Sequence, residues 1–176
     1  RFNTTLVTGV RGYGLFSSSD AGASWQPLAR PSDLGQAYHI NRLAIAPDGT
    51  PYVAWHDDSG GDNEIYVRRW NGSSWEEVGA GSASGGGISR NGSVSGAPAL
   101  AVTPDSTPYV AWNDDGDEDT EIYVRRWNGS NWEEVGAGSA SGGGISNNSG
   151  NSAAPAIAVG PNGTPYVVWS DSSGAD

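Results

Sequence analysis

The sequence contains no cysteine and no methionine, and it contains no lysine because all nine basic residues are arginine. The lack of cysteine excludes disulfides, thiolate metal sites and cysteine nucleophiles. The lack of both sulfur-containing residues removes the side chains that oxidise most readily, which suits an exposed and oxidising location. We therefore expect an extracellular or cell-surface protein.

Positive charge is also scarce, since 20 acidic residues outnumber nine basic ones and the formal net charge is -11. Nucleic acids and anionic membranes attract patches of lysine and arginine, so this composition excludes nucleic acid as a partner. No apolar run approaches the roughly 20 residues that a helix needs to cross a bilayer. The sequence therefore predicts no membrane insertion.

An internal repeat dominates the chain. Tyr52, Tyr109 and Tyr166 are 57 residues apart and lie in the segments TPYVAW, TPYVAW and TPYVVW. Residues 64–73 and 121–130 share the sequence EIYVRRWNGS, and residues 75–89 and 132–146 share WEEVGAGSASGGGIS. Self-similarity at a fixed period of this length is typical of solenoids and propellers.

Each repeat contains four short runs of β-forming residues, separated by turn signals rich in proline, aspartate, asparagine and glycine. In the second complete repeat these runs cover residues 99–103, 107–113, 121–127 and 131–136. No segment shows a helical hydrophobic period. We therefore predict an all-β fold, a β-propeller of four-stranded antiparallel blades that is incomplete in this chain.

The repeat divides the chain into four parts. These are a partial, diverged blade over residues 1–35, complete blades over 36–92 and 93–149, and the first two strands of a further blade over 150–176. A closed propeller typically needs four to eight blades. We expect either that the chain, which begins at Arg1, is a segment of a longer protein, or that copies close a ring by self-assembly.

One hairpin in each repeat can be interpreted residue by residue. With residues 71–74 as the loop, Trp70 faces Trp75, Arg69 faces Glu76 and Arg68 faces Glu77. The next repeat then pairs Trp127 with Trp132, Arg126 with Glu133 and Arg125 with Glu134. Aromatic pairs and opposite charges that face each other stabilise antiparallel strands, so these residues have a structural role available.

The same hairpins have a functional interpretation as sugar-binding surfaces, because aromatic faces stack on pyranose C–H groups while arginine and glutamate bond hydroxyls. The candidate ligand-binding residues are Trp70, Trp75, Arg69, Glu76, Trp127, Trp132, Arg126 and Glu133. Repetition would make such sites multivalent. The strand-ending residues Trp55, Trp112 and Trp169 are expected to pack between blades instead.

Near the N-terminus, residues 18–25 read SSDAGASW. Their Ser18, Asp20, Gly22, Ser24 and Trp25 resemble the Asp-box of sialidase-like (BNR-repeat) propellers. The resemblance implies a structural turn between the third and fourth strands of a blade, in which the aspartate and tryptophan hold the outer hairpin together. The complete repeats resemble the same group through YVAW, an acidic turn and EIYVRRW, with WNGSSW or WNGSNW in place of the Asp-box.

The resemblance does not extend to the residues of sialidase catalysis. That family uses an arginine triad, a tyrosine nucleophile with a glutamate partner, an aspartate acid and usually an Arg-Ile-Pro motif, which is absent from this sequence. Arg68 and Arg125 recur with the repeat, as do Arg69 and Arg126, whereas one central site needs different residues from different blades. We predict no catalytic residue and no enzyme activity in this chain.

The acidic turns are candidate calcium sites, since Ca²⁺ takes six to eight oxygen ligands. The candidate ligands are Asp57, Asp58, Asp62 and Glu64 in one turn, and Asp114, Asp115, Asp117, Asp119 and Glu121 in the next. Their spacing differs from that of an EF-hand loop, and aspartate and glycine are ordinary turn formers. No cofactor is required, and calcium binding stands as a hypothesis beside a solvated turn.

The glycine- and serine-rich segments 79–95 and 136–152 have the composition of flexible linkers. In a propeller they lie where the outer strand of one blade crosses to the inner strand of the next. Their identity is interpreted as a trace of duplication that the fold does not require.

The sequence as a whole predicts a non-catalytic extracellular or cell-surface module for binding or scaffolding of a protein or glycan partner. Two alternatives remain open. One is a multivalent carbohydrate-binding propeller lectin, and the other is a segment of a sialidase-like glycoside hydrolase whose catalytic residues lie outside this chain.

Overall fold

The computed structural model describes residues 6–10, 14–29, 40–58, 60–116 and 119–174. These residues form thirteen β-strands and the turns between them. The described part of the chain has no helix long and apolar enough to span a membrane. Every strand pairing is antiparallel, and the strands form four separate sheets.

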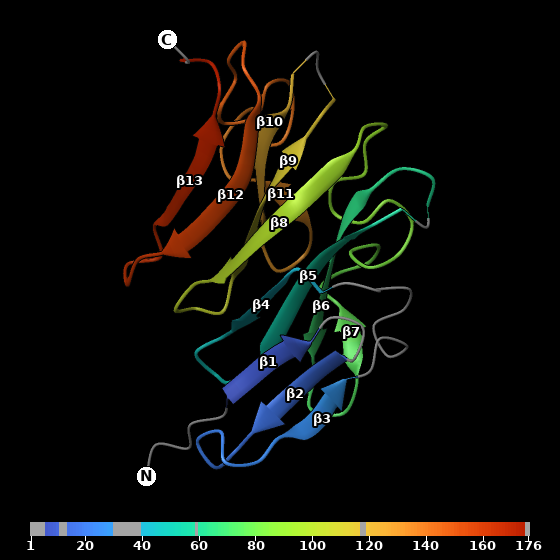
Figure 1. The fold of residues 1–176 in the computed structure, drawn as a ribbon, viewed down its shortest axis with the longest axis vertical. Helices are drawn as coiled ribbons and strands as arrows, with labels where there is room; N and C mark the ends of the chain where they lie inside the picture. Colours follow the sequence, from blue (N-terminus) through green and yellow to red (C-terminus); the bar gives the residue numbers. More distant parts are fainter. Residues whose placement is uncertain (1–5, 11–13, 30–39, 59, 117–118, 175–176) are drawn as a thin grey trace.

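The four sheets follow one another along the chain and along the long axis of the molecule (Figure 1). The first contains β1 (Leu6–Val10), β2 (Gly14–Ser18) and β3 (Gln26–Ala29). The second contains β4 (Arg42–Ile45), β5 (Pro51–Asp57), β6 (Glu64–Trp70) and β7 (Trp75–Glu77). The third contains β8 (Ser95–Val102), β9 (Pro108–Asp114), β10 (Glu121–Trp127) and β11 (Trp132–Glu134), and the fourth β12 (Ser152–Val159) and β13 (Pro165–Asp171).

The second and third sheets are four-stranded blades in which the strands pair in sequence order. The first strand of the third blade, β8, contacts β4 and β5 of the second blade and β12 of the fourth sheet. This stacking through the first strands confirms the predicted propeller of four-stranded antiparallel blades. The described sheets form an arc and do not close into a ring.

The first strand of the third blade is longer than predicted. It begins at Ser95, and its pairing with β9 shifts register between Gly96 and Ala99. Within this β-bulge Ala97 has a φ of 45°, in the left-handed region, and β12 repeats the feature with Ala154 at 52°. A bulge re-aims a strand and increases its local twist. The strand therefore extends toward the N-terminus beyond Pro98, although the bulge interrupts the alternation of side chains between the two faces of the sheet.

The predicted hairpin register is confirmed in both copies. Trp70 pairs with Trp75 and Arg69 with Glu76 in the second blade, and the third blade repeats this pairing. The two tryptophan rings of each hairpin lie 5.8 and 6.1 Å apart between centroids. The cross-strand pairs inferred from the sequence thus exist as interactions, whatever further role their side chains have.

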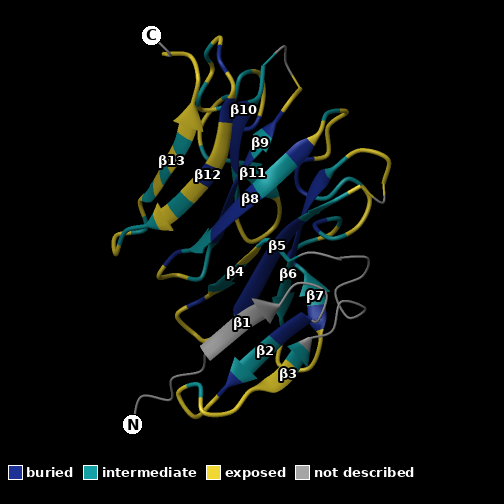
Figure 2. Ribbon diagram, in the orientation of Figure 1, coloured by how far each residue is buried: buried dark blue, intermediate teal, exposed yellow. Residues whose placement is uncertain are grey.

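The main core lies between the second and third blades, where buried residues concentrate along β5, β6, β8 and β9 (Figure 2). Ile65 and Val67 of β6 belong to one cluster with Val110 and the fully buried Trp112 of β9. Trp55 lies in a second cluster that includes residues of the first sheet. Packing of Trp55 and Trp112 between blades is confirmed. Each blade therefore buries its apolar faces against its neighbours.

The glycine- and serine-rich connections pack against the blades, so particular residues in them have a structural role that the interpretation as a trace of duplication did not include. After the short β7, the connection turns back and completes the open edge of β6. The N–H of Val67 donates to the Ser82 carbonyl at 2.7 Å, and the N–H of Ile88 donates to the Ile65 carbonyl at 2.7 Å. The buried Ser82 hydroxyl donates to the Val67 carbonyl and accepts the N–H of Val78.

Two glycines of these connections lie so close to the third strand of their blade that a side chain would not fit. A Cβ added at Gly87 would lie 2.1 Å from the Ile65 carbonyl oxygen, and one at Gly144 would lie 2.2 Å from that of Ile122. Both glycines also have φ values near 60°, which residues with a Cβ adopt at a cost. The connection can therefore lie against the third strand only where the side chain is absent.

Candidate binding site between two blades

A cleft of about 700 Å³ lies at one end of the interface between the second and third blades. Its lining comprises residues 48–52, 69–72 and 76 of the second blade and residues 105–107 and 127–129 of the third. The two stretches that precede β5 and β9 supply one side, and the ends of β6 and β10 supply the other. Antiparallel pairing brings these positions together because β5 begins where β6 ends.

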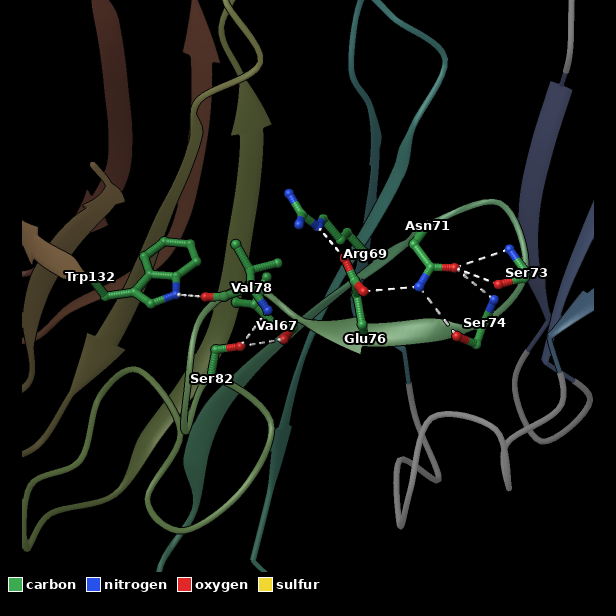
Figure 3. Close-up of polar contacts among 9 residues, drawn as sticks. All are labelled: Val67, Arg69, Asn71, Ser73, Ser74, Glu76, Val78, Ser82 and Trp132. Atoms are coloured by element: carbon green, nitrogen blue, oxygen red, sulfur yellow. Dashed lines mark hydrogen bonds and ion pairs between the residues drawn. The ribbon is translucent and has the colours of Figure 1, made fainter. Parts of the chain in front are cut away.

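The charged centre of the cleft is an ion pair on the second blade (Figure 3). Arg69 Nε donates to Glu76 Oε1 at 2.8 Å. Asn71 Nδ2 donates to the other carboxylate oxygen at 2.9 Å, and Asn71 Oδ1 accepts the backbone N–H groups of Ser73 and Ser74. The loop between the two strands therefore fixes Glu76 from the side opposite Arg69.

These contacts set the charges of the pair. Hydrogen bonds from Asn71 and then Arg69 lower the pKa of Glu76. The bond to Glu76, with a further contribution from Tyr52, raises the pKa of Arg69. Both side chains are about 40% exposed, at 42% for Arg69 and 37% for Glu76. At neutral pH the cleft thus presents a fixed guanidinium and a fixed carboxylate to solvent.

Two further carboxylates come from the turns before β5 and β9. The backbone N–H of Thr50 donates to Asp48 at 2.9 Å, and this contact lowers the pKa of Asp48. Asp105 accepts the hydroxyl of Thr103 and the N–H of Thr107, which lower its pKa in the same way. The lining therefore carries three carboxylates and one guanidinium.

The structure separates the eight predicted ligand-binding residues into two groups. Trp70, Arg69, Glu76 and Trp127 line the cleft, whereas Trp75, Trp132, Arg126 and Glu133 lie outside its lining. Trp75 is only 7% exposed and belongs to a core cluster. Trp132 is half-buried, and its indole N–H donates to the Val78 carbonyl of the neighbouring blade at 2.8 Å (Figure 3).

Sequence reasoning missed the contribution of Asp48, Tyr52 and Asp105 to the cleft. The available signal is the repetition of the segments PDGTPY and PDSTPY, each of which also fits an ordinary turn followed by a strand. A turn aspartate that bonds the backbone two residues on is held with its carboxylate fixed. Such a residue can line a site without any unusual motif.

The acidic turns are built around hydrogen-bonded carboxylates. Asp114 is 1% exposed. It accepts bonds from the side chains of Asn91, Ser93, Ser95 and Trp112 and from the N–H of Gly116. The buried Glu64 accepts the Ser89 hydroxyl, and Glu121 accepts that of Ser146. These carboxylates therefore tie each blade to the connection that follows or precedes it.

The calcium hypothesis remains a prediction. Among the described residues no group of three or more histidine, cysteine, aspartate or glutamate side chains is arranged to hold a metal ion. Asp57 is the last residue of β5, Asp58, Asp62, Asp115 and Asp119 lie between strands, and Asp117 lies outside the described residues. The oxygen atoms of Asp114 have protein donors as partners, as detailed above.

The segment that resembles an Asp-box forms the loop between β2 and β3. Asp20 Oδ1 accepts the N–H of Ser24 at 2.8 Å, and the buried Ser18 hydroxyl accepts the N–H of Gly22 at 2.8 Å. Bonds from Ser24 and then Ser18 lower the pKa of Asp20 to about 2. Trp25 is 39% exposed. The aspartate and serines thus hold the turn, while more than a third of the tryptophan surface remains exposed.

Comparisons with known proteins give little beyond the fold. No protein-family model and no curated protein matches the chain. Among solved structures, the chain is similar to an endo-arabinase from Bacteroides thetaiotaomicron, with a TM-score of 0.45 and 15% sequence identity. The match covers 88% of this chain and 59% of that structure. The chain thus spans about three-fifths of the length of the structure that it resembles.

Proposed function

We propose that this chain is a non-catalytic, extracellular propeller module that binds a glycan in the cleft between two blades. The observation that carries the proposal is the composition of the cleft, whose lining includes Trp70 and Trp127 from two blades together with Arg69 and Glu76. Aromatic rings offer flat apolar faces, and fixed charged groups bond hydroxyls strongly. The volume also lies within the range of about 300–1,000 Å³ that is usual for ligand sites.

The protonation states in the cleft support binding over hydrolysis. Glycoside hydrolysis generally requires one carboxylic acid whose pKa is raised, so that it can protonate the leaving group, beside a second carboxylate. Asp48, Glu76 and Asp105 all have lowered pKa values because each accepts hydrogen bonds. These three groups can accept hydrogen bonds from sugar hydroxyls but are poor proton donors at neutral pH.

The repeat supports a multivalent mode of binding. The residues that line the cleft on the third blade, among them Asp105, Trp127 and Asn128, repeat at the 57-residue period those of the second blade. Each further pair of complete blades would place another cleft at the equivalent position, and the next copy of Asp48 and Asp105 in this chain is Asn162. Weak sites that engage one polymer together gain avidity without new contacts.

Intrinsic tryptophan fluorescence tests the proposal, because two indoles line the cleft. The 176-residue chain is titrated with a panel of neutral oligosaccharides of three or more pyranose units, and a saturable change in emission is expected. Arg69→Gln should weaken binding by about tenfold or more, since a hydrogen bond to a charged group contributes about 1.5–3 kcal/mol. A panel that gives no saturable change at millimolar concentration would overturn the proposal.

Arg126→Gln is the matched control. Arg126 makes the same ion pair with Glu133, at 2.9 Å, in a hairpin that differs only by Asn131 in place of Ser74, but lies outside the cleft lining. Its replacement should leave glycan affinity unchanged and alter thermal stability as Arg69→Gln does. Equal loss of affinity in the two variants would show that the ion pair acts through hairpin stability and not through contact with the glycan.

A further inference from the structure

A second pocket, of about 460 Å³, lies at the opposite end of the same blade interface. Its described lining comes from the connection after the second blade, including Arg90, Asn91 and Ser93, and from Tyr123 and Arg125 of β10. The hairpin ends that form the first cleft are at the other end of β10. The two hollows are therefore separate, although one pair of blades forms both.

The two hollows differ in charge. Three carboxylates and one arginine line the first cleft. The described lining of the second pocket contains Arg90 and Arg125 and no aspartate or glutamate. The charged side chains of this described lining are therefore both basic, in a chain whose net charge is -11.

Arg125 is held in the pocket with part of its guanidinium unused. Its Nη1 donates to the Ile88 carbonyl across the blade interface. Its Nε is buried and has no hydrogen-bond partner among the described residues. Burial lowers the pKa of Arg125, and the charge of Glu134 offsets part of this effect. A buried donor without a partner costs free energy, so the unpaired Arg125 Nε is an unfavourable feature of this structure.

Glu134 is bonded elsewhere and does not supply that acceptor. Its carboxylate accepts the Ser141 hydroxyl at 2.6 Å and the backbone N–H groups of Ala140 and Gly138 at 3.0 and 3.2 Å. Arg69 and Arg126 form ion pairs within 4.0 Å with Glu76 and Glu133, whereas Glu134 is not within that distance of Arg125. Glu134 thus interacts with Arg125 through its charge but is not its hydrogen-bond partner.

The polar residues beside Arg125 are fixed from behind. Asn91 Nδ2 and the Ser93 hydroxyl both donate to the buried Asp114 carboxylate, at 2.7 and 2.6 Å. Further donors from Ser95 and Trp112 also bond this carboxylate. Its charge is therefore spread over several hydrogen bonds, and it serves to position Asn91 and Ser93.

We propose that this second pocket binds a carboxylate group, with Arg125 and Arg90 as its cationic partners. The carboxylate is either a small free acid or the acid group of a uronic acid, since both present the same planar pair of oxygens that guanidinium groups bond well. The site is distinct from the glycan cleft. Its occupancy does not require that cleft to bind a neutral glycan.

Isothermal titration calorimetry of the 176-residue chain distinguishes the sources of the ligand. Sodium glucuronate, sodium acetate and neutral glucose are titrated at one ionic strength held with sodium chloride. Saturable heat with glucuronate and acetate assigns the site to free carboxylates, and saturable heat with glucuronate alone assigns it to an acidic sugar. Either result supports the proposal, whereas no saturable heat with either acid overturns it.

Three variants locate the binding. Arg125→Gln should weaken carboxylate binding at least about tenfold, as expected for loss of a charge-assisted hydrogen bond. Arg90→Asn should weaken it by a smaller factor and keep the fold, because Arg90 has a φ of 43° and Asn147 occupies the equivalent position at 41°. Arg42→Gln removes the same charge from an exposed residue outside both hollows.

The outcomes separate this proposal from the proposed glycan cleft. Arg125→Gln and Arg90→Asn should lose carboxylate heat but keep the fluorescence response to neutral oligosaccharides, and Arg69→Gln should do the reverse. If Arg125→Gln fails to fold, Arg90→Asn alone decides. Equal weakening by Arg90→Asn and Arg42→Gln would overturn the site, because it would show a response to net charge alone.

Discussion

The second and third blades carry almost the same sequence but differ in how much of it they bury. Ile88 is 2% exposed, whereas Ile145, its counterpart in the identical segment GGGIS, is 37% exposed. Val78 is 1% exposed, and its counterpart Val135 is only half-buried. The complete third blade covers the first member of each pair, while two strands of the fourth sheet lie beside the second.

Local geometry, in contrast, is the same in both copies. Ser82 and Ser139 make the same bonds to Val67 and Val124, at 3.0 Å in each case. Identical sequence therefore specifies the hairpins and connections, and the neighbour specifies the burial. Because the repeats themselves are nearly identical, differences in stability between the copies arise mainly from the interfaces between neighbouring blades.

The isoleucine pair should give the largest difference. Ile88→Ala removes a fully packed side chain between blades and should lower the free energy of unfolding by about 2–5 kcal/mol. Ile145→Ala removes a partly exposed side chain and should lower it by about 1 kcal/mol or less. Urea denaturation of both variants measures the difference. Equal losses would mean that Ile145 is covered to the same extent in solution.

A glycine pair should give the next largest difference. A Cβ at Gly79 would lie 2.1 Å from the ring of Trp127, and the φ of Gly79 is 85°. Gly79→Ala should therefore cost about 1–3 kcal/mol through overpacking alone. A Cβ at Gly136 meets no atom within 4 Å, so Gly136→Ala should change the free energy of unfolding by about 0.5 kcal/mol at most. Thermal melts of the two variants test this contrast.

The smallest effect concerns Glu64, whose pKa is raised chiefly by burial and further by the Asp114 carboxylate. Below the ordinary glutamate pKa the group is neutral whether the chain is folded or not. As pH rises, the unfolded chain ionises first, so the contribution of Glu64 to stability is lost as pH passes through its raised pKa. The free energy of unfolding of the wild type should thus fall relative to Glu64→Gln as pH rises above the ordinary glutamate pKa.

The measurement is a set of urea curves at several pH values for the wild type and Glu64→Gln. Glu76→Gln is the control, because the pKa of Glu76 is lowered and its contribution to the free energy of unfolding should change with pH in the opposite direction. Its stabilising contribution is present above the ordinary glutamate pKa and is lost as pH falls. A difference between wild type and Glu64→Gln that does not change with pH would contradict the assigned cause.

The sequence predicted the blades well because their signals are local and repeated. The run 121–127 matches β10, and the facing of Arg69 with Glu76 follows from a short loop and from charge pairing. The bulge near Ala97 was missed, since a non-glycine residue with positive φ leaves no compositional trace. The predicted run 131–136 is reduced to Trp132–Glu134 because the connection, and not a fourth strand, bonds the rest of β10.

The candidate site was predicted only in part. Trp70 and Arg69 could be named from composition, but which copy of each residue lies in a cleft depends on blade packing. Trp132 and Trp127 are adjacent on one hairpin, yet only Trp127 lines the cleft. The anchoring role of Asp114 needed knowledge of Asn91 and Ser93, which approach from the preceding connection. Contacts between repeats cannot be derived from one repeat alone.

The return of each glycine-serine connection along the third strand has a consequence for aggregation. Chains of nearly identical repeats are at risk of pairing a strand with the wrong copy, in the same molecule or another one. Because Ser82 and Ile88 occupy the N–H and carbonyl groups of Val67 and Ile65, that strand offers no free backbone edge there. An unpaired edge invites intermolecular strand addition, so these segments protect repeats that would otherwise recognise one another.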